Sequence, residues 1–485
     1  MKIDGARIET DRDIRSDMLA SRVRSGFAGF CLVLVSLLPL DAVAQITQPL
    51  PLIPSPAPPS APSAPVSQAP TSSAGQTVIN RARPEFDPLG FRFGDYYLFP
   101  RAELDESYNS NIFATTTGAT YDLLTALSPS FDLLSISPRG GLNLHGSSVT
   151  QIYADHPAQN TQDGTVNVDG HLDVTAGSSL YGNAQVAHQH ISYGSPNSPI
   201  NIAQSPTSPT NLVQFLSSPR GIAQPVTYWN YVARAGYMQG GRRFSYQVEA
   251  GVNAAQYNAA PLVGGGVLPQ AGSDASISDV ALTGNYEIIP DYLGYVRVGG
   301  SLFNYWHATA NNSTTYRVDT GLQIAPRHLI SGRVYVGYLV QNYAQSSLGS
   351  TSAPDYGGEL VWNVTPFTTL TFDGLRTFYT GTPASSTTQV AGPAGSGYLE
   401  STFAVNADHE LLRNLLLNVY ASYENDSFQG ITRTDDVFIG GGGFRYLVNR
   451  NFFLGGSFSY QRRASTASGA SYSQSILMVK LGTQF

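Results

Sequence analysis

The stretch YSQSILMVKLGTQF, residues 472–485, decides how we interpret the rest of the chain. One face of this segment carries apolar and aromatic side chains, interrupted only by a threonine: Leu477, Val479, Leu481 and Phe485. Lys480 lies on the opposite face, because side chains alternate between the two faces of a strand. The pattern predicts a half-buried strand that ends on an aromatic residue. A globular edge strand can end in the same way, so the upstream sequence must decide between the two.

The composition of the 485-residue chain suits a membrane β-barrel. Charged residues make up 13% of the chain, and 48 glycines and 28 tyrosines are present. Apolar residues placed at alternate positions build no long hydrophobic run. The net charge of −7 gives no basic surface for nucleic acid. The single cysteine, Cys31, precedes the predicted cleavage site, which excludes a disulfide framework in the mature chain.

Residues 1–44 have the pattern of a cleaved secretory signal peptide. Two arginines precede an apolar core at 26–38 that is too short to span a bilayer as a helix, and Ala42-Val43-Ala44 is a cleavage site. The segment before this core is long and acidic, so translation starts at Met1 or at Met18. Residues 45–89 are rich in Pro, Ser and Ala and predict a disordered periplasmic linker, with an ordered plug as the alternative.

From Tyr97 onward the apolar residues recur with a period of two, as in the run of residues 244–253. Short and long connections alternate along this part of the chain. Short turns are expected at 137–139, 177–178, 241–242, 290–291, 326–327, 365–366, 411–412 and 449–451. Longer loops are expected at 108–120, 155–161, 193–225, 259–273, 307–312, 344–354, 380–397, 427–432 and 464–471. This predicts an all-β, up-and-down antiparallel transmembrane β-barrel of about 18 strands over residues 90–485. A soluble β-sandwich or propeller would not sort its loops by length so regularly.

The opening hairpin contains FRFGDYYLFPRAEL at 91–104 and YNSNIFA at 108–114, in which Tyr108, Asn109, Asn111 and Phe113 form a motif. This sequence resembles the family of outer-membrane β-barrel porins, type 2. The resemblance covers about residues 86–485 and implies a link to exopolysaccharide export in Gram-negative bacteria. The final strand is similar to the closing strand of outer-membrane barrels, which implies that the barrel-assembly machinery reads Leu477, Val479, Leu481 and Phe485.

Charged residues on the polar faces of the predicted strands are candidates for a pore lining: Arg234, Arg297, Arg317, Arg333, Asp169, Asp173, Glu249 and Lys480. If the positive and the negative side chains lie on different walls, an electric field across the lumen would orient dipolar or anionic solutes. Alternatively, neighbouring arginines and carboxylates neutralise one another. A barrel of this size leaves an aqueous channel unless a segment fills it. Loop 193–225 is expected to fold inward or to cap the mouth, with a disordered surface loop as the alternative.

No residue pattern indicates an enzyme, a cofactor site or a metal site. Nucleophilic catalysis needs a serine, a base and an orienting group, and the sequence has no Gly-x-Ser-x-Gly elbow. His188 and His190 share an outer face and are interpreted as an interfacial pair. His171, between Asp169 and Asp173, is interpreted as part of a solvated inner patch.

The sequence therefore predicts a passive or weakly selective pore in the outer membrane of a Gram-negative cell, exported through the inner membrane by a cleaved signal peptide. The expected partners are the lipid bilayer, the assembly machinery and a periplasmic or exopolysaccharide-export component, but not nucleic acid. The alternative is a non-conducting scaffold barrel that docks a periplasmic partner through the linker. An outer-membrane lipid-modifying enzyme is the third hypothesis.

Overall fold

The computed structural model describes residues 76–485, apart from 136, 138, 194–222, 263–264, 308, 327, 346–348, 380–396, 430–431 and 468. These residues belong to one compact unit of the chain. The predicted signal peptide, the two possible start codons, residues 45–75 of the predicted linker and most of loop 193–225 lie outside the described residues.

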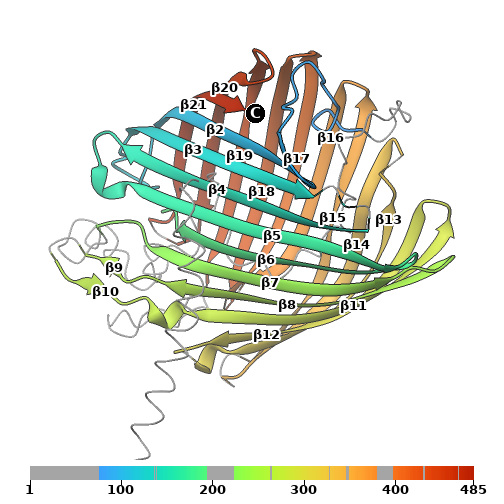
Figure 1. The fold of residues 1–485 in the computed structure, drawn as a ribbon. Helices are drawn as coiled ribbons and strands as arrows, with labels where there is room; N and C mark the ends of the chain where they lie inside the picture. Colours follow the sequence, from blue (N-terminus) through green and yellow to red (C-terminus); the bar gives the residue numbers. More distant parts are fainter. Residues whose placement is uncertain are drawn as a thin grey trace, which may run out of the picture. The chain divides into compact units, whose positions relative to one another are not determined.

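Eighteen antiparallel strands close into a barrel, which confirms the predicted fold class (Figure 1). The strands have 12 to 16 residues. They are β2 (Tyr96–Asn109), β3 (Asp122–Ser135), β4 (Gly140–Tyr153), β5 (Thr161–Thr175), β6 (Ser178–His190), β7 (Thr227–Gln239), β8 (Phe244–Tyr257), β11 (Ala275–Ile289), β12 (Tyr292–Tyr305), β13 (Ser313–Ile324), β14 (Ile330–Tyr343), β15 (Ser350–Thr365), β16 (Thr368–Tyr379), β17 (Gly397–Leu412), β18 (Leu415–Gln429), β19 (Thr434–Leu447), β20 (Phe452–Ser465) and β21 (Tyr472–Gln484).

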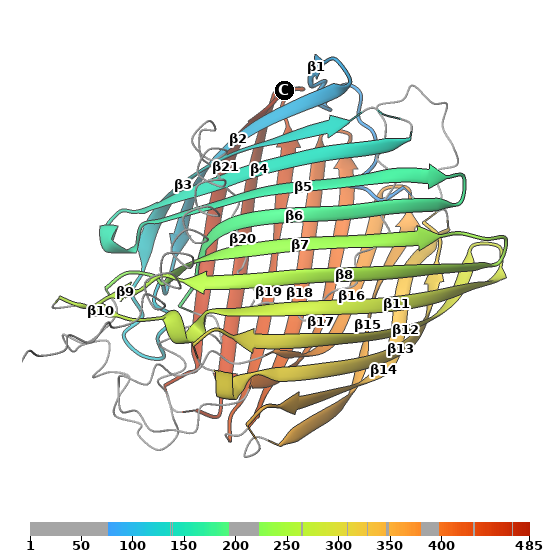
Figure 2. The same cartoon turned by 60° about the horizontal axis from the view of Figure 1, so that its bottom comes forward.

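Consecutive strands pair with one another, and the first and last strands close the barrel. Residues Arg101–Asn109 of β2 pair with β21. The short strand β1 (Phe91–Phe93) adds to the start of β2 and lies beside the carboxyl terminus (Figure 2). Outside the wall, β9 (Ala260–Pro261) and β10 (Val267–Leu268) form a small hairpin, and η1 (Pro157–Gln159), η2 (Ala271–Ser273) and η3 (Thr309–Asn311) are single turns. No helix in the described part of the chain has the length and apolarity to cross a membrane.

Short and long connections lie at opposite ends of the barrel, which we call the turn end and the loop end; the carboxyl terminus is at the turn end. Two expected boundaries were wrong. The turn expected at Leu411–Leu412 lies at 413–414, because a bulge after Glu410 extends β17. The loop expected at 344–354 ends earlier, because β15 begins at Ser350 and pairs there with β14. Pro354 is tolerated because, among the described residues, pairing of β15 with β16 begins only at Gly357.

Beyond that point the ends of β16 and β17 lie on the inner side of their neighbours. Phe378 and Leu399 belong to the outer faces of β16 and β17, yet they pack with Leu339 and Ala353 from the inner faces of β14 and β15. Phe378 is almost completely buried. The hairpin end formed by residues 376–379 and 398–400, here called the inward tip, therefore narrows the lumen near the loop end.

Candidate functional site

The strand register places all eight candidate pore-lining residues on the inner face of the barrel. This face alternates with an outer face of exposed apolar side chains; Val479, for example, is 63% exposed beside the inward Lys480. The inward charges are Asp169 and Asp173 in β5, Arg234 in β7, Glu249 in β8, Arg297 in β12, Arg317 in β13, Arg333 in β14 and Lys480 in β21. Positive and negative side chains lie on the same groups of neighbouring strands, so they do not produce a simple electric field across the lumen.

Arg234 is neutralised by the adjacent strands. One guanidinium nitrogen forms an ion pair with Glu249 in β8, and the other lies 3.5 Å from Asp279 Oδ1 in β11. Tyr181 in β6 donates a hydrogen bond to Glu249 Oε2 over 3.1 Å. Gly236 makes room for the Tyr181 ring, because a Cβ at this position would lie 2.2 Å from the ring. The network fixes the arginine against the wall.

Arg317 is paired in the same way. Its Nε lies 2.8 Å from Asp319 Oδ2 and 2.6 Å from Asp355 Oδ2, and its guanidinium stacks 5.0 Å from the centre of the Tyr335 ring. The two carboxylates come from β13 itself and from β15. The predicted alternative of mutual neutralisation therefore describes the arrangement at Arg234 and Arg317.

Arg297 differs from both. It is only 5% exposed, and among the described residues no side chain or backbone group forms a hydrogen bond or a salt bridge with it. A hollow of about 30 Å³ beside Arg297 and Arg317 is lined by three hydroxyl-bearing side chains, one of them Thr377 of the inward tip, and by apolar residues and glycines. This volume holds a water molecule or a small ion. A buried guanidinium without a bonded acceptor has unused binding capacity for an anion.

Of the remaining candidates, Asp169 and Lys480 bond to neighbouring side chains, Arg333 stacks on an aromatic ring, and Asp173 is exposed. Asp169 accepts a hydrogen bond from Asn143 Nδ2 over 3.0 Å. Lys480 forms an ion pair with Glu103 and lies 3.5 Å from Asp105 Oδ2, so charge pairs join the closing strands β21 and β2. Arg333 stacks 5.1 Å from the centre of the Tyr295 ring.

The family motif fastens the β2–β3 loop to β21. Asn109 Oδ1 accepts hydrogen bonds from the Asn111 backbone N–H and from Gln474 Nε2, both over 2.9 Å. Asn111 is almost fully buried, and its Nδ2 donates to Ser473 O over 3.0 Å. Phe113 packs edge-on against His156 and Tyr193, and Tyr108 packs against Tyr121. Both asparagines use their side chains to stabilise the turn, which is a structural role.

Sequence reasoning missed a group of carboxylates at the loop end. Oxygen atoms of Glu400, Glu424 and Asp426 lie within 4.8 Å of one another on the inner face. The alternation Glu424-x-Asp426 could have indicated that two of them share a face. The third comes from another strand, and only the register of β17 with β18 brings it close.

Sequence reasoning also missed contacts of residues 76–89, the end of the predicted linker, which we call the N-terminal strap. Val78 is almost fully buried, and its N–H donates to Thr369 Oγ1 over 2.9 Å. Arg83 Nη2 donates to Glu410 Oε2 over 2.8 Å. Arg450 Nη2 donates to Pro84 O over 2.6 Å. These contacts hold the strap against the turns at the turn end of the barrel.

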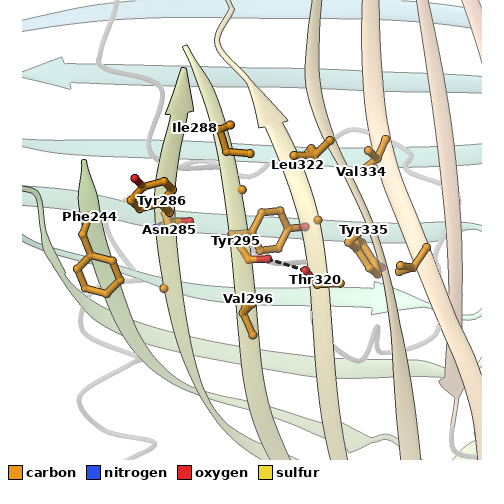
Figure 3. Close-up of a pocket in the computed structure, with 14 residues that line it drawn as sticks. Phe244, Asn285, Tyr286, Ile288, Tyr295, Val296, Thr320, Leu322, Val334 and Tyr335 are labelled. Carbon is orange, nitrogen blue, oxygen red and sulfur yellow. Dashed lines mark hydrogen bonds between the residues drawn. The ribbon is translucent and has the colours of Figure 1, made fainter. Parts of the chain in front are cut away.

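A second hollow near these strands lies on the outer face and is not part of the lumen. It has a volume of about 820 Å³ and is lined by outward side chains such as Phe244, Ile288 and Val296 (Figure 3). Gly284 and Gly294 occupy outward positions there, and their missing side chains leave the space. This hollow faces apolar surroundings and carries no charged lining residue.

His188 lies on the predicted outer face, and the adjacent Asp435 and Asp436 point to opposite faces of β19. His188 packs against Trp229 on the outer face, and His190 Nδ1 lies 2.8 Å from Asp163 Oδ2. Asp435 points inward to Arg433, whereas Asp436 points outward and accepts a hydrogen bond from the Tyr423 hydroxyl over 2.6 Å.

A closed barrel of 18 strands with an apolar outer face and a charged inner face defines an outer-membrane β-barrel protein of the pore type. The chain belongs to the family described as "Putative beta-barrel porin 2", whose model matches residues 83–485. This confirms the family resemblance of the opening hairpin and supports an outer-membrane location.

Solved structures similar to this chain include outer-membrane proteins of two Pseudomonas species. OpdK from Pseudomonas aeruginosa is 10% identical, with a TM-score of 0.40, over 80% of this chain and 99% of that one. OccK2 (OpdF) from the same organism is 12% identical, with a TM-score of 0.41, over 82% and 99%. A BenF-like porin from Pseudomonas fluorescens Pf-5 is 11% identical, with a TM-score of 0.39, over 80% and 99%. No curated protein matches the sequence.

Proposed function

We propose that the barrel forms a passive pore across the outer membrane with a weak preference for anions. A barrel of 18 strands is wide enough to enclose water. The observation that carries the proposal is the contrast between Arg297, which has no bonded acceptor among the described residues, and Arg234 and Arg317, which are paired with carboxylates. A guanidinium on the inner wall without a bonded acceptor attracts anionic groups.

Single-channel recording of the mature chain, residues 45–485, in planar bilayers tests this proposal. We expect a steady conductance and a reversal potential, in a KCl gradient, displaced toward the chloride potential. The Arg297→Gln variant is expected to move that potential toward zero. Arg462→Gln serves as the control, because Arg462 lies on the outer face, exposed, near the loop end. Silence of a protein that migrates as a folded, heat-modifiable barrel would refute the pore.

The proposal includes a link to exopolysaccharide export, which rests on the family resemblance. Deletion of the gene in a polysaccharide-producing host should lower the polysaccharide outside the cell and raise it in the periplasm. Unchanged export would remove this part of the proposal and leave the pore intact. No residue pattern in the chain favours an enzyme.

The N-terminal strap favours a second candidate, a scaffold that holds a periplasmic partner. The strap fixes residues 76–89 at the turn end, the end at which a periplasmic partner would meet the barrel. Under this candidate the protein does not conduct, and removal of residues 45–75 releases a periplasmic protein that otherwise copurifies with the barrel. Conductance measurements separate the two candidates.

A further inference from the structure

Three acidic side chains converge on the inner wall near the loop end. Glu400 in β17 stands directly opposite Asp426 in β18, and Glu424 lies two residues before Asp426 on the same face. Their carboxylate oxygens lie within 4.8 Å of one another. Asp426 also stands opposite Asp435 in β19. Like charges in directly opposite cross-strand positions repel one another, so this row needs compensation.

Asp426 is the member of the group that lacks hydrogen-bond donors. It is fully buried, and neither of its carboxylate oxygens accepts a hydrogen bond from any described residue. A buried carboxylate without donors is strongly unfavourable unless a cation or a proton neutralises it. Its position between Glu400 and Glu424 directs these unused oxygens into the carboxylate group.

The salt bridges of the two nearby arginines are with a different carboxylate, Asp435, and Arg463 also attracts Glu424 and Asp426 electrostatically. Arg433 Nε donates to Asp435 Oδ1 over 2.9 Å, and its Nη2 lies 2.5 Å from Asp435 Oδ2. Arg463 Nε lies 3.7 Å from the same Oδ2. Glu400 accepts a hydrogen bond from Thr402 Oγ1 over 2.9 Å. Neither arginine donates a hydrogen bond to Asp426, so this buried carboxylate has no donor among the described residues.

We propose that Glu400, Glu424 and Asp426 bind a divalent cation of the Ca²⁺ or Mg²⁺ type. A divalent ion supplies the positive charge that the buried Asp426 carboxylate lacks from hydrogen-bond donors, and carboxylate oxygens are the ligands that these hard cations prefer. The three side chains offer neither sulfur nor imidazole, which disfavours softer metals. Asp426 lies three residues from the end of β18 at the loop end, so the site is close to the medium on that side. Bound there, the ion joins β17 to β18 beside the inward tip.

Binding is tested on the mature chain in detergent after treatment with EDTA. Terbium(III), excited through nearby tyrosines, reports occupancy, and Ca²⁺ and Mg²⁺ are titrated separately as competitors. We expect saturable terbium emission that either ion displaces, and an apparent affinity at least tenfold weaker in the Asp426→Asn and Glu424→Gln variants. Asp436→Asn should bind as the unmodified protein does, because Asp436 points outward from the neighbouring strand β19.

The competing explanation is a proton shared within the group, and thermal unfolding separates it from the cation. With a cation site, millimolar Ca²⁺ or Mg²⁺ raises the unfolding temperature of the unmodified protein but not that of Asp426→Asn. With a shared proton, divalent ions have no effect and Asp426→Asn unfolds at the same or a higher temperature. That result, or equal loss of terbium binding in Asp436→Asn, would overturn the proposal. Heat-modifiable migration on a gel verifies that each variant is folded, and none of these readouts depends on conductance.

Discussion

Replacement of Glu410 by alanine is expected to release the N-terminal strap from the barrel. The Glu410 side chain is 2% exposed and lies at the centre of three arginines. Arg83 contacts it over 2.8 Å, Arg81 over 3.6 Å and Arg413 over 3.7 Å. Only Arg83 is itself buried, so it provides most of the interaction energy, whereas the partly exposed Arg81 and Arg413 are screened by water.

The size of the effect follows from the burial of Arg83. Removing one partner of a buried ion pair costs about 3–5 kcal/mol. The strap can avoid this cost by detaching, because a detached Arg83 is hydrated. Detachment in turn gives up the burial of Val78, worth about 1.5–3 kcal/mol, and a few hydrogen bonds, and regains chain entropy. Since each 1.4 kcal/mol is a factor of ten, a loss of about 3 kcal/mol raises the detached population roughly a hundredfold.

Limited trypsin digestion measures that population. From Gln45, the first residue after the predicted cleavage site, to Asn80 the sequence contains no lysine or arginine, so the Arg81–Ala82 bond is the first site in the mature chain. Cleavage there should be faster by roughly a hundredfold in Glu410→Ala, with the barrel intact. Asp408→Ala is the matched control: Asp408 is equally buried on the same face of β17, but it accepts hydrogen bonds from Asn406 and Asn418. Equal cleavage rates in the two variants would refute the role of Glu410.

Two further predictions concern the last strand, β21, which closes the barrel by pairing with β2. Gly482→Ala would place a Cβ 1.9 Å from the ring of Phe453, which is fully buried. We therefore expect the free energy of unfolding to fall by about 1–3 kcal/mol. Gly284→Ala is the control and should be neutral, because no atom lies nearer than 3.7 Å to its added Cβ. Phe485 stacks on Phe91, with ring centres 6.3 Å apart. If its main role is recognition by the assembly machinery, Phe485→Ala should lower the amount of barrel in cells but refold normally in detergent; equal loss in both assays would assign it a packing role only.

The alternation of apolar and polar residues was enough to predict the architecture. In β21 the pattern Leu477-x-Val479-x-Leu481 assigns the outer face, and the structure places Lys480 on the inner face as the alternation requires. The strand period is two, so a single apolar pair fixes the face of every other residue in the strand. Connection lengths could be predicted for the same reason, because turn residues interrupt the alternation.

Contacts between distant strands could not be predicted from local pattern. The second contact of Arg234, with Asp279 45 positions away, depends on the register of β8 with β11. Arg83 reaches Glu410 across most of the sequence. The inward tip arises because β15 and β16 stop pairing beyond Gly357, and no local signal marks that point. The motif at Asn109 and Asn111 indicated that the chain belongs to the family, but it did not indicate that these residues fasten the β2–β3 loop to β21.

The inner wall is best understood as a series of local charge balances rather than as a field across the lumen. Pairs such as Arg317 with Asp355 join atoms 2.6 Å apart, and their combined field decays within a few ångströms. At physiological salt, charges separated by more than about 8 Å are screened from one another. A charged solute in the lumen is therefore attracted or repelled mainly where a charged side chain lacks a partner of opposite charge. Two such places are Arg297, near the middle of β12, and the carboxylates around Asp426, near the loop end. If a divalent cation neutralises the second, the positive charge at Arg297 becomes the dominant local imbalance, which is the arrangement that favours anions.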